Sequence, residues 1–147
     1  MNYSAEIIIE LPRQKLVELF DNTENMYKWQ EGLLSFDHLE GTPGHEGARS
    51  SLVYASRKGD LKMTGTIIRR NLPDEFHVLY EAKGVYNEIY NHFTENEPGK
   101  TTWRTVNVFR FRGLMALMAL FMKSAFKSQT LLTMERFKIF AENNKQQ

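Results

Sequence analysis

Residues 83–113 read KGVYNEIYNHFTENEPGKTTWRTVNVFRFRG, two runs rich in β-branched and aromatic residues on either side of a Pro-Gly turn. Runs of this kind bounded by turn residues favour a β-hairpin. Similar turn signals recur earlier in the chain, at residues 41–44 (Gly-Thr-Pro-Gly), 58–59 (Lys-Gly) and 72–74 (Leu-Pro-Asp). The pattern therefore predicts an antiparallel meander of six strands that ends near residue 111.

The segments on either side of the meander complete the predicted fold. Ile7–Ile9 is a β-branched run suited to a strand, and Pro12 with the helical spacing of Leu16–Phe20 predicts a helix directly after it. A second short helix is expected through Trp29. From Leu114 to Gln147 there is no Gly or Pro and apolar residues recur, which predicts one long helix. We expect an α+β fold in which a curved seven-stranded antiparallel sheet wraps a long C-terminal helix.

Size and composition limit the function classes. At 147 residues the chain has the usual size of one domain, so we expect one domain over residues 1–147. A net charge of +1 argues against a nucleic-acid partner. The chain has no cysteine, which excludes disulfides and thiolate nucleophiles and favours a reducing cytoplasm. The N-terminus lacks the basic and apolar regions of an export signal.

Neither a metal site nor a membrane span is expected from the sequence. The four histidines are scattered, and His45-Glu46 lacks a second histidine four residues on, so no metal and no cofactor are predicted. Residues 114–122 (LMALMALFM) supply only about half of the ~20 apolar residues that a bilayer crossing needs. We expect this segment to be a buried part of the terminal helix, without stable membrane insertion.

Centring each hairpin on its turn predicts which side chains share the inner face of the sheet, because opposite residues in an antiparallel pair have a constant sum of residue numbers. The turns at Lys83 and Glu95–Lys100 place an aromatic-rich face against the helix. His77, Asn87 and Asn91 are expected on the opposite, solvent-facing side. The predicted pairs across the last hairpin are His92 with Trp103, Tyr90 with Thr105, Glu88 with Asn107 and Tyr86 with Phe109, and the adjoining strands add Phe76, Val78, Tyr80, Ile67, Gly65, Met63, Tyr54 and Leu52.

This order of elements resembles the START-like (SRPBCC, helix-grip) superfamily, nearest its polyketide cyclase/dehydrase and lipid-transport group. The likeness spans almost the whole chain, and none of its motifs is a strict catalytic signature. Because members hold an apolar ligand between the sheet and the terminal helix, the resemblance implies such a cavity here. The residues that carry it are Ile7–Pro12 leading to Leu16–Asp21, Trp29, Pro73–Phe76, Pro98–Thr101 and the helix Leu114–Glu142.

Together the inner face and the flexible methionines of the helix define the predicted ligand-binding residues. Tyrosine rings with single hydroxyls suit an apolar pocket that has a few orienting polar groups. The same rings and methionines would also suit ordinary core packing. The predicted set is Tyr54, Phe76, Tyr80, Tyr86, Glu88, Tyr90, His92, Trp103, Thr105, Asn107, Phe109, Met118 and Met122.

Glu88 is the candidate for chemistry, because an inward carboxylate among apolar side chains would favour its neutral form and suit acid–base work. The alternative is that Asn107 and water satisfy Glu88, which then only orients a ligand or stabilises the fold. A direct dyad with His92 is excluded, since four residues along a strand span roughly 13 Å. His92 is expected beside Trp103 at the strand end.

Three functions are consistent with these observations. The first is binding of a small hydrophobic molecule, such as a lipid, polyketide or aromatic metabolite, in the cavity between sheet and helix. The second is a cyclase or dehydratase that uses Glu88 as acid or base. The third is a partner-binding or dimerisation module formed by the apolar helix from Leu114 and the Gly41–Gly47 loop, so that a monomer and a homodimer both stay open.

Overall fold

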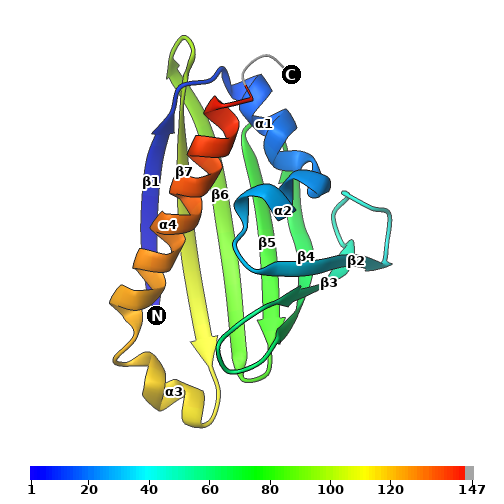
Figure 1. Cartoon of the computed structure of the whole chain (residues 1–147), viewed down its shortest axis with the longest axis vertical. Helices are drawn as coiled ribbons and strands as arrows, with labels where there is room; N and C mark the ends of the chain where they lie inside the picture. The colour runs from blue at the N-terminus through cyan, green and yellow to red at the C-terminus, as the bar shows by residue number, and fades with distance from the viewer. Residues whose placement is uncertain (145–147) are drawn as a thin grey trace.

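The computed structural model describes residues 1–144 of the chain, which form one antiparallel sheet with helices on its concave side (Figure 1). The chain begins with a strand, passes through two short helices and a 3-10 turn, and then builds six further strands before two C-terminal helices. The elements are β1 (Asn2–Ile9), α1 (Arg13–Asp21), η1 (Thr23–Asn25), α2 (Met26–Trp29), β2 (Leu33–Glu40), β3 (Arg49–Tyr54), β4 (Leu61–Asn71), β5 (Glu75–Ala82), β6 (Val85–Glu97), β7 (Lys100–Phe111), α3 (Leu114–Ala119) and α4 (Lys123–Glu142).

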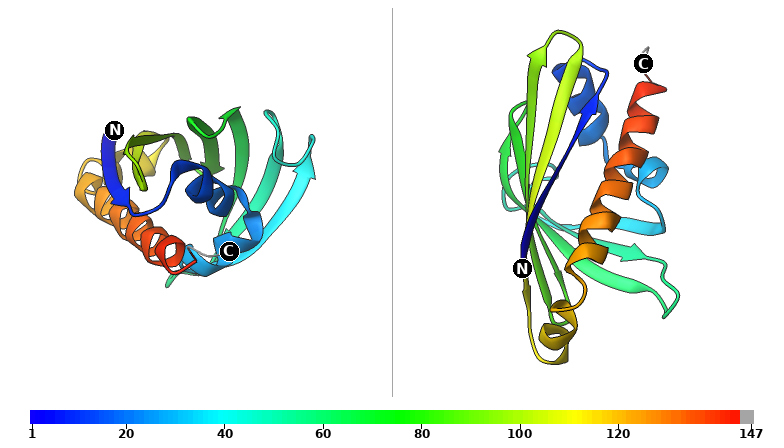
Figure 2. Two further views of the ribbon diagram at one scale, coloured as in Figure 1. Left: turned by 90° about the horizontal axis from the view of Figure 1, so that it is seen from above. Right: turned by 90° about the vertical axis from the view of Figure 1, so that its left-hand side faces the viewer.

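The seven strands lie in the order β1-β7-β6-β5-β4-β3-β2, so the meander is in sequence order and the first strand adds to its last member. Seen from above, the sheet curls around an interior that α4 covers on one side and α1 and α2 close on another (Figure 2). The predicted α+β class, the seven antiparallel strands and the grip on a C-terminal helix are therefore confirmed.

One part of the interior is filled by a cluster of aromatic rings. Phe137 of α4 is 0% exposed, and its ring centroid lies 5.0 Å from that of Trp29 and 5.4 Å from that of Trp103. Phe20 of α1 packs between them, with its ring centroid 5.5 Å from that of Trp103 and 5.1 Å from that of Phe93. Edge-to-face rings at these separations combine large apolar burial with favourable quadrupole geometry. The aromatic cluster thus holds α1, α2 and α4 against the sheet.

The prediction of one continuous C-terminal helix is wrong. The helix is interrupted at residues 120–122, and Met122 has non-helical dihedral angles at the start of α4. In Figure 1 α3 lies at the end of the sheet, where it contacts β7, and Met115 lies against the turn at Gly84. Leu114 is 81% and Phe121 is 87% exposed. The LMALMALFM segment is therefore an exposed apolar surface and not a buried helix.

A different set of α4 residues faces the sheet. Met134, Phe137 and Ala141 recur at helical spacing and are buried, whereas Leu132 is exposed. The N-terminal strand fastens to the same helix, because the Tyr3 hydroxyl lies 2.7 Å from Thr130 Oγ1. None of the helices in residues 1–144 combines the length and apolar character that a membrane crossing needs.

Replacing Phe137 with alanine is expected to lower the free energy of unfolding by about 3–5 kcal/mol, because it removes a buried ring from the centre of the aromatic cluster. Urea unfolding followed by circular dichroism measures the loss. Ile139→Ala is the matched control on the exposed side of α4 and should change the value by less than about 0.5 kcal/mol. Equal effects of the two substitutions would contradict this account of the core.

Candidate functional site

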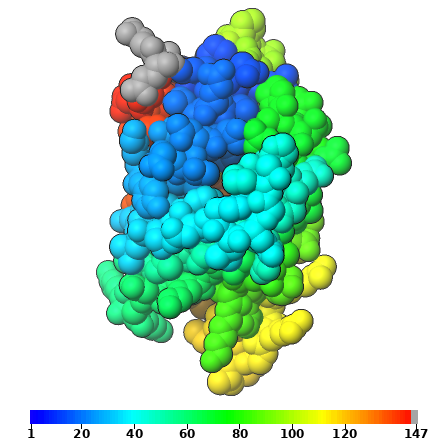
Figure 3. Space-filling model, turned by 90° about the vertical axis from the view of Figure 1, so that its right-hand side faces the viewer, coloured from blue at the N-terminus to red at the C-terminus, as the bar shows by residue number. Residues whose placement is uncertain are grey.

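A cavity of about 920 Å³ lies between the concave face of the sheet, α4 and the α1–α2 region. Its walls are mostly apolar side chains from β3 to β7 and from α4. Exposed residues such as Asp21, Thr23 and Pro43 also line it, so it reaches the surface between α1 and the β2–β3 loop. Figure 3 shows the face on which these segments meet, with a small recess between them. The interior is thus filled near Phe137 and hollow further along the sheet.

The register of the last hairpin decides which residues face this cavity. Phe93 pairs with Trp103, Asn91 with Thr105 and Ile89 with Asn107. The predicted register, which paired His92 with Trp103, is wrong by one residue. Because side chains alternate faces along a strand, this shift turns every β6 side chain to the opposite side of the sheet.

The physical cause of the shift is a tight turn followed by a bulge. Glu97 pairs with Lys100, so only Pro98 and Gly99 form the turn, and Gly99 takes a positive φ of 79° that favours glycine. The pairing then shifts by one residue between Thr94 and Glu97, which is a β-bulge on β6. A loop centred symmetrically on residues 95–100 misses this bulge.

Four predicted ligand residues consequently lie outside the cavity. Tyr86, Glu88, Tyr90 and His92 share the outer face of β6, and none of them lines the cavity. The Tyr90 hydroxyl donates a hydrogen bond to Glu88 Oε2 on that outer face. The prediction that Glu88 points inward beside Asn107 is therefore wrong.

The remaining strands keep their predicted face. The Lys83-Gly84 turn also differs by one residue from the prediction, since Ala82 pairs with Val85. The two shifts cancel, so β5 stays inward, and the pairs Ile67 with Val78 and Gly65 with Tyr80 are confirmed. β3 is offset from the predicted pairing by two residues, which preserves its face. Of the predicted set, Tyr54, Phe76, Tyr80, Trp103, Thr105, Asn107 and Phe109 line the cavity.

The last two predicted residues are displaced by the break in the helix. Met118 belongs to α3 and Met122 to the interruption before α4, and neither lines the cavity. The helical wall consists instead of residues outside the predicted set: Phe126, Gln129, Thr130, Thr133 and Met134.

Two asparagine side chains of β6, predicted on the solvent-facing side, point into the cavity instead. Asn91 and Asn87 both line the cavity. Asn91 Oδ1 accepts a hydrogen bond of 2.9 Å from Trp103 Nε1, whereas buried Asn87 Oδ1 has no partner among the described residues. Centring the turn on Pro98-Gly99 would not by itself correct the face, because it still pairs even-numbered β6 residues with Thr105 and Asn107; the bulge between Thr94 and Glu97 is what turns Asn87 and Asn91 inward.

The β7 wall carries a second pair of polar groups. Asn107 Nδ2 donates a hydrogen bond of 3.3 Å to Thr105 Oγ1, and both residues are buried. On the far wall the Tyr54 hydroxyl donates to Gln30 Oε1. The cavity therefore combines apolar walls with a few fixed amide and hydroxyl groups.

Tyr80 lies deep in the cavity wall against Gly65. A β-carbon at Gly65 would lie 3.0 Å from Tyr80 Cε1, so the glycine leaves room for the ring to lie against β4. Burial raises the pKa of Tyr80 to about 12, and burial together with Tyr80 raises the pKa of Tyr54. Both hydroxyls therefore keep their protons at neutral pH.

Comparisons with known proteins place the chain by its fold. No family model and no curated protein sequence matches it. Among solved structures, a conserved protein from Geobacillus kaustophilus matches with a TM-score of 0.81 at 12% identity, covering 97% of this chain and 96% of that one. The Zhui aromatase/cyclase from Streptomyces sp. R1128 matches with a TM-score of 0.80 at 9% identity, covering 97% and 93%.

Norcoclaurine synthase from Thalictrum flavum, solved in complex with dopamine and hydroxybenzaldehyde, has a TM-score of 0.72 at 7% identity, covering 100% of this chain and 89% of that one. Identities this low show the fold alone. The matches to these solved structures agree with the seven-stranded sheet and the C-terminal helix described above.

Replacing Tyr80 with phenylalanine is expected to reduce the loss of stability above pH ~10. The pKa of Tyr80 is about 12 in the folded state, against an ordinary value of 10.0. Its contribution to the free energy of unfolding is therefore fully present below pH 10 and is lost as the pH rises from 10 to 12. Between pH ~8 and pH ~11 the free energy of unfolding of the wild type should therefore fall by about 1 kcal/mol more than that of Tyr80→Phe.

Urea unfolding at these two pH values measures the difference. Tyr86→Phe, an exposed tyrosine on the outer face, is the control and should behave like the wild type. Parallel pH dependences for Tyr80→Phe and the wild type would contradict the burial of this hydroxyl.

Proposed function

We propose that this chain, which has the START-like helix-grip fold, binds a small hydrophobic molecule in the cavity between its sheet and α4. The observation that carries the proposal is the cavity of about 920 Å³ with mostly apolar walls. Ligand pockets commonly measure ~300–1,000 Å³ and combine apolar walls with a few polar groups. A lipid, a polyketide or an aromatic metabolite has the chemistry to occupy such a space.

The polar groups of the cavity would orient the ligand. Asn87 Oδ1 lacks a hydrogen-bond partner among residues 1–144, so a donor group on the ligand would relieve the cost of burying it. Asn107 and the Tyr80 hydroxyl provide further hydrogen-bonding groups on the neighbouring strands. Apolar contact supplies the affinity in this proposal, at up to ~0.8 kcal/mol for each buried CH₂ group.

Two structural neighbours favour a ring-bearing organic ligand within this class. One is described as an aromatase/cyclase, and the other was solved with dopamine and hydroxybenzaldehyde. Ring stacking is available in this chain from Phe76, Trp103 and Phe109, all of which line the cavity.

Binding is favoured over cyclase or dehydratase chemistry by the position of the titratable groups. Glu88 cannot serve as the acid–base group, since its carboxylate lies on the outer face of the sheet. Asp21, Glu31 and His38 also line the cavity, but all three are exposed to solvent; the other polar groups of the wall are amides, hydroxyls and the protonated tyrosines Tyr54 and Tyr80. General acid–base catalysis works best with a positioned group whose pKa lies near the working pH, and the buried part of the cavity wall offers tyrosines with raised pKa values instead.

Filling the cavity should abolish binding. Ile89→Trp adds a large side chain to the cavity wall of β6, and the dissociation constant of the fluorescent probe 1-anilinonaphthalene-8-sulfonate is expected to rise about tenfold or more. Glu88→Trp places the same ring on the outer face of the adjacent position and should leave the constant within about twofold.

Circular dichroism and urea unfolding establish that both variants fold. Unchanged probe affinity in folded Ile89→Trp would refute binding in this cavity.

Native mass spectrometry of freshly purified protein tests the same proposal without a probe. A co-purified small organic molecule is expected on the wild type and should be missing from folded Ile89→Trp. Equal occupancy of Ile89→Trp would place that molecule elsewhere on the protein.

A further inference from the structure

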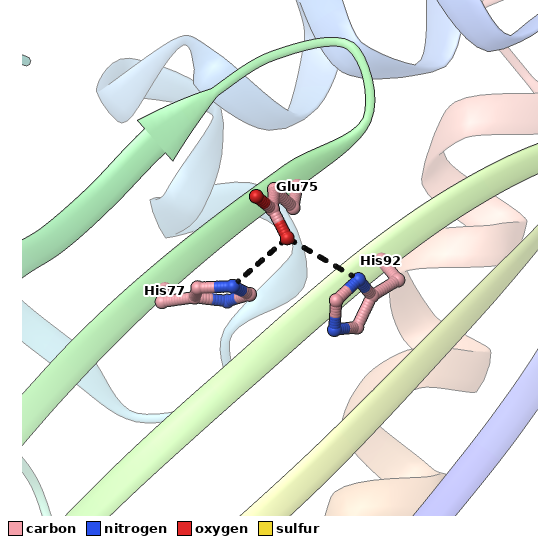
Figure 4. A group of neighbouring side chains, drawn as sticks. All are labelled: Glu75, His77 and His92. Atoms are coloured by element: carbon pink, nitrogen blue, oxygen red, sulfur yellow. Dashed lines mark hydrogen bonds and ion pairs between the residues drawn. The ribbon is translucent and has the colours of Figure 1, made fainter.

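A compact group of three potential metal ligands lies on the outer face of the sheet, opposite the cavity (Figure 4). Glu75 is the first residue of β5, and His77 is two residues further on, so the two side chains share one face. His92 on β6 is the direct cross-strand partner of Glu75. Figure 4 shows the three side chains pointing toward one another.

The distances suit a shared cation. Glu75 Oε2 lies 3.2 Å from His77 Nε2 and 3.6 Å from His92 Nδ1, and the three candidate ligand atoms lie within 4.8 Å of one another. Ligand atoms at ~2.0–2.1 Å from a tetrahedral zinc ion are roughly 3.4 Å apart. Small side-chain rotations would therefore bring all three atoms into coordination distance.

The surroundings of the three side chains favour metal coordination. Arg69 Nε donates a hydrogen bond to Glu75 Oε1, which fixes the carboxylate and leaves Oε2 directed at the histidines. His77 is 7% exposed, so its ring is held in place beside Glu75 Oε2. The side chain of His92 is 42% exposed, which leaves solvent access for a fourth ligand.

We propose that Glu75, His77 and His92 form a binding site for a divalent transition metal, with water in the remaining position. Two imidazoles and one carboxylate suit zinc, nickel or copper better than magnesium or calcium, which prefer oxygen ligands. The sequence predicts no metal site because the two histidines are fifteen residues apart, and only the pairing of β5 with β6 brings them together. The charge of Arg69 opposes a cation, so we expect micromolar affinity and not the tight binding of a structural zinc site.

Isothermal titration with zinc chloride on chelator-treated full-length protein tests this site. One equivalent of zinc should bind, and His92→Ala should weaken binding about tenfold or more. His92 is partly exposed, so its removal should leave the fold intact. His45→Ala removes an exposed histidine outside the cluster and should leave the zinc affinity unchanged.

Long-range ¹H–¹⁵N spectra of the histidine rings provide a second readout. Zinc should shift His77 Nε2 and His92 Nδ1 and leave the rings of His38 and His45 unchanged. Equal zinc affinity of His92→Ala and the wild type, or no saturable binding up to millimolar zinc, would refute the site. The probe titration of the cavity is independent, because the cluster lies on the other face of the sheet.

The exposed α3 segment carries a second, independent inference. Leu114, Leu117, Leu120 and Phe121 are all exposed, and α3 lies at the end of the sheet (Figure 1). Arg112 precedes this apolar group, and Lys123 and Lys127 follow it. Residues 105–134, from the second half of β7 into α4, contain four basic residues (Arg110, Arg112, Lys123 and Lys127) and no Asp or Glu, although the whole chain is almost neutral.

The charge and the apolar character of this surface together favour one kind of binding partner. An apolar segment flanked by cations matches the boundary between anionic headgroups and acyl chains. We infer that α3 docks on the surface of an anionic bilayer without crossing it. A second copy of the chain is disfavoured, because two such surfaces would bring their cations together.

Sedimentation with vesicles of phosphatidylcholine containing about 30% phosphatidylglycerol tests the docking surface. The wild type should bind these vesicles, and binding should fall about fivefold or more with pure phosphatidylcholine or at ~0.5 M salt. Leu117→Asp with Phe121→Asp should abolish binding, whereas Ile139→Asp, an exposed apolar position on α4, should not.

Equal binding of the Leu117→Asp/Phe121→Asp variant would refute docking through α3. Analytical ultracentrifugation tests the alternative that α3 is a dimer interface. If the wild type is a dimer and the double variant is a monomer, α3 binds a second copy of the chain and the membrane proposal is refuted.

Discussion

The contact of Phe137 with Trp29 and Trp103 is the interaction on which the rest of the molecule depends. It joins α4 to α2 and to the first half of β7, and Phe20 extends it to Phe93. Because aromatic rings are large and stiff, the contact sets the spacing between helix and sheet at one end. Further along β7 the same spacing leaves a hollow, since Thr105 and Asn107 are smaller than the tryptophan that precedes them.

The two faces of β6 give the protein two chemically different surfaces. Asn87, Ile89 and Asn91 line the cavity, while Glu88 and His92 lie on the outside. One bulge between Thr94 and Glu97 determines this division, because a change of one residue exchanges the two sets. The bulge therefore separates Glu88 from Thr105 and Asn107, while the tight turn between Ala82 and Val85 sets the β5–β6 register that brings His92 beside Glu75.

In the two C-terminal helices, the most apolar segment is not the one that is buried. Residues 114–122 are the most apolar stretch of the C-terminal region, yet they are exposed, while the less apolar α4 supplies Met134 and Phe137 to the core. Burial depends on what lies opposite a side chain, and α3 lies at the end of the sheet and not across its concave face. The apolar residues of α3 therefore stay exposed, where they can contact a surface outside the protein.

The sequence by itself determined the order of elements, the antiparallel meander and the inward face of β3, β4, β5 and β7, because turn residues and alternation are local signals. Seven of the predicted cavity residues, from Tyr54 to Phe109, follow from those signals. Only the tertiary structure decided the face of β6, the break before Lys123 and the meeting of Glu75 with both histidines. Each of these depends on register or on the extent of a neighbouring element, and such long-range pairing leaves little trace in a local pattern.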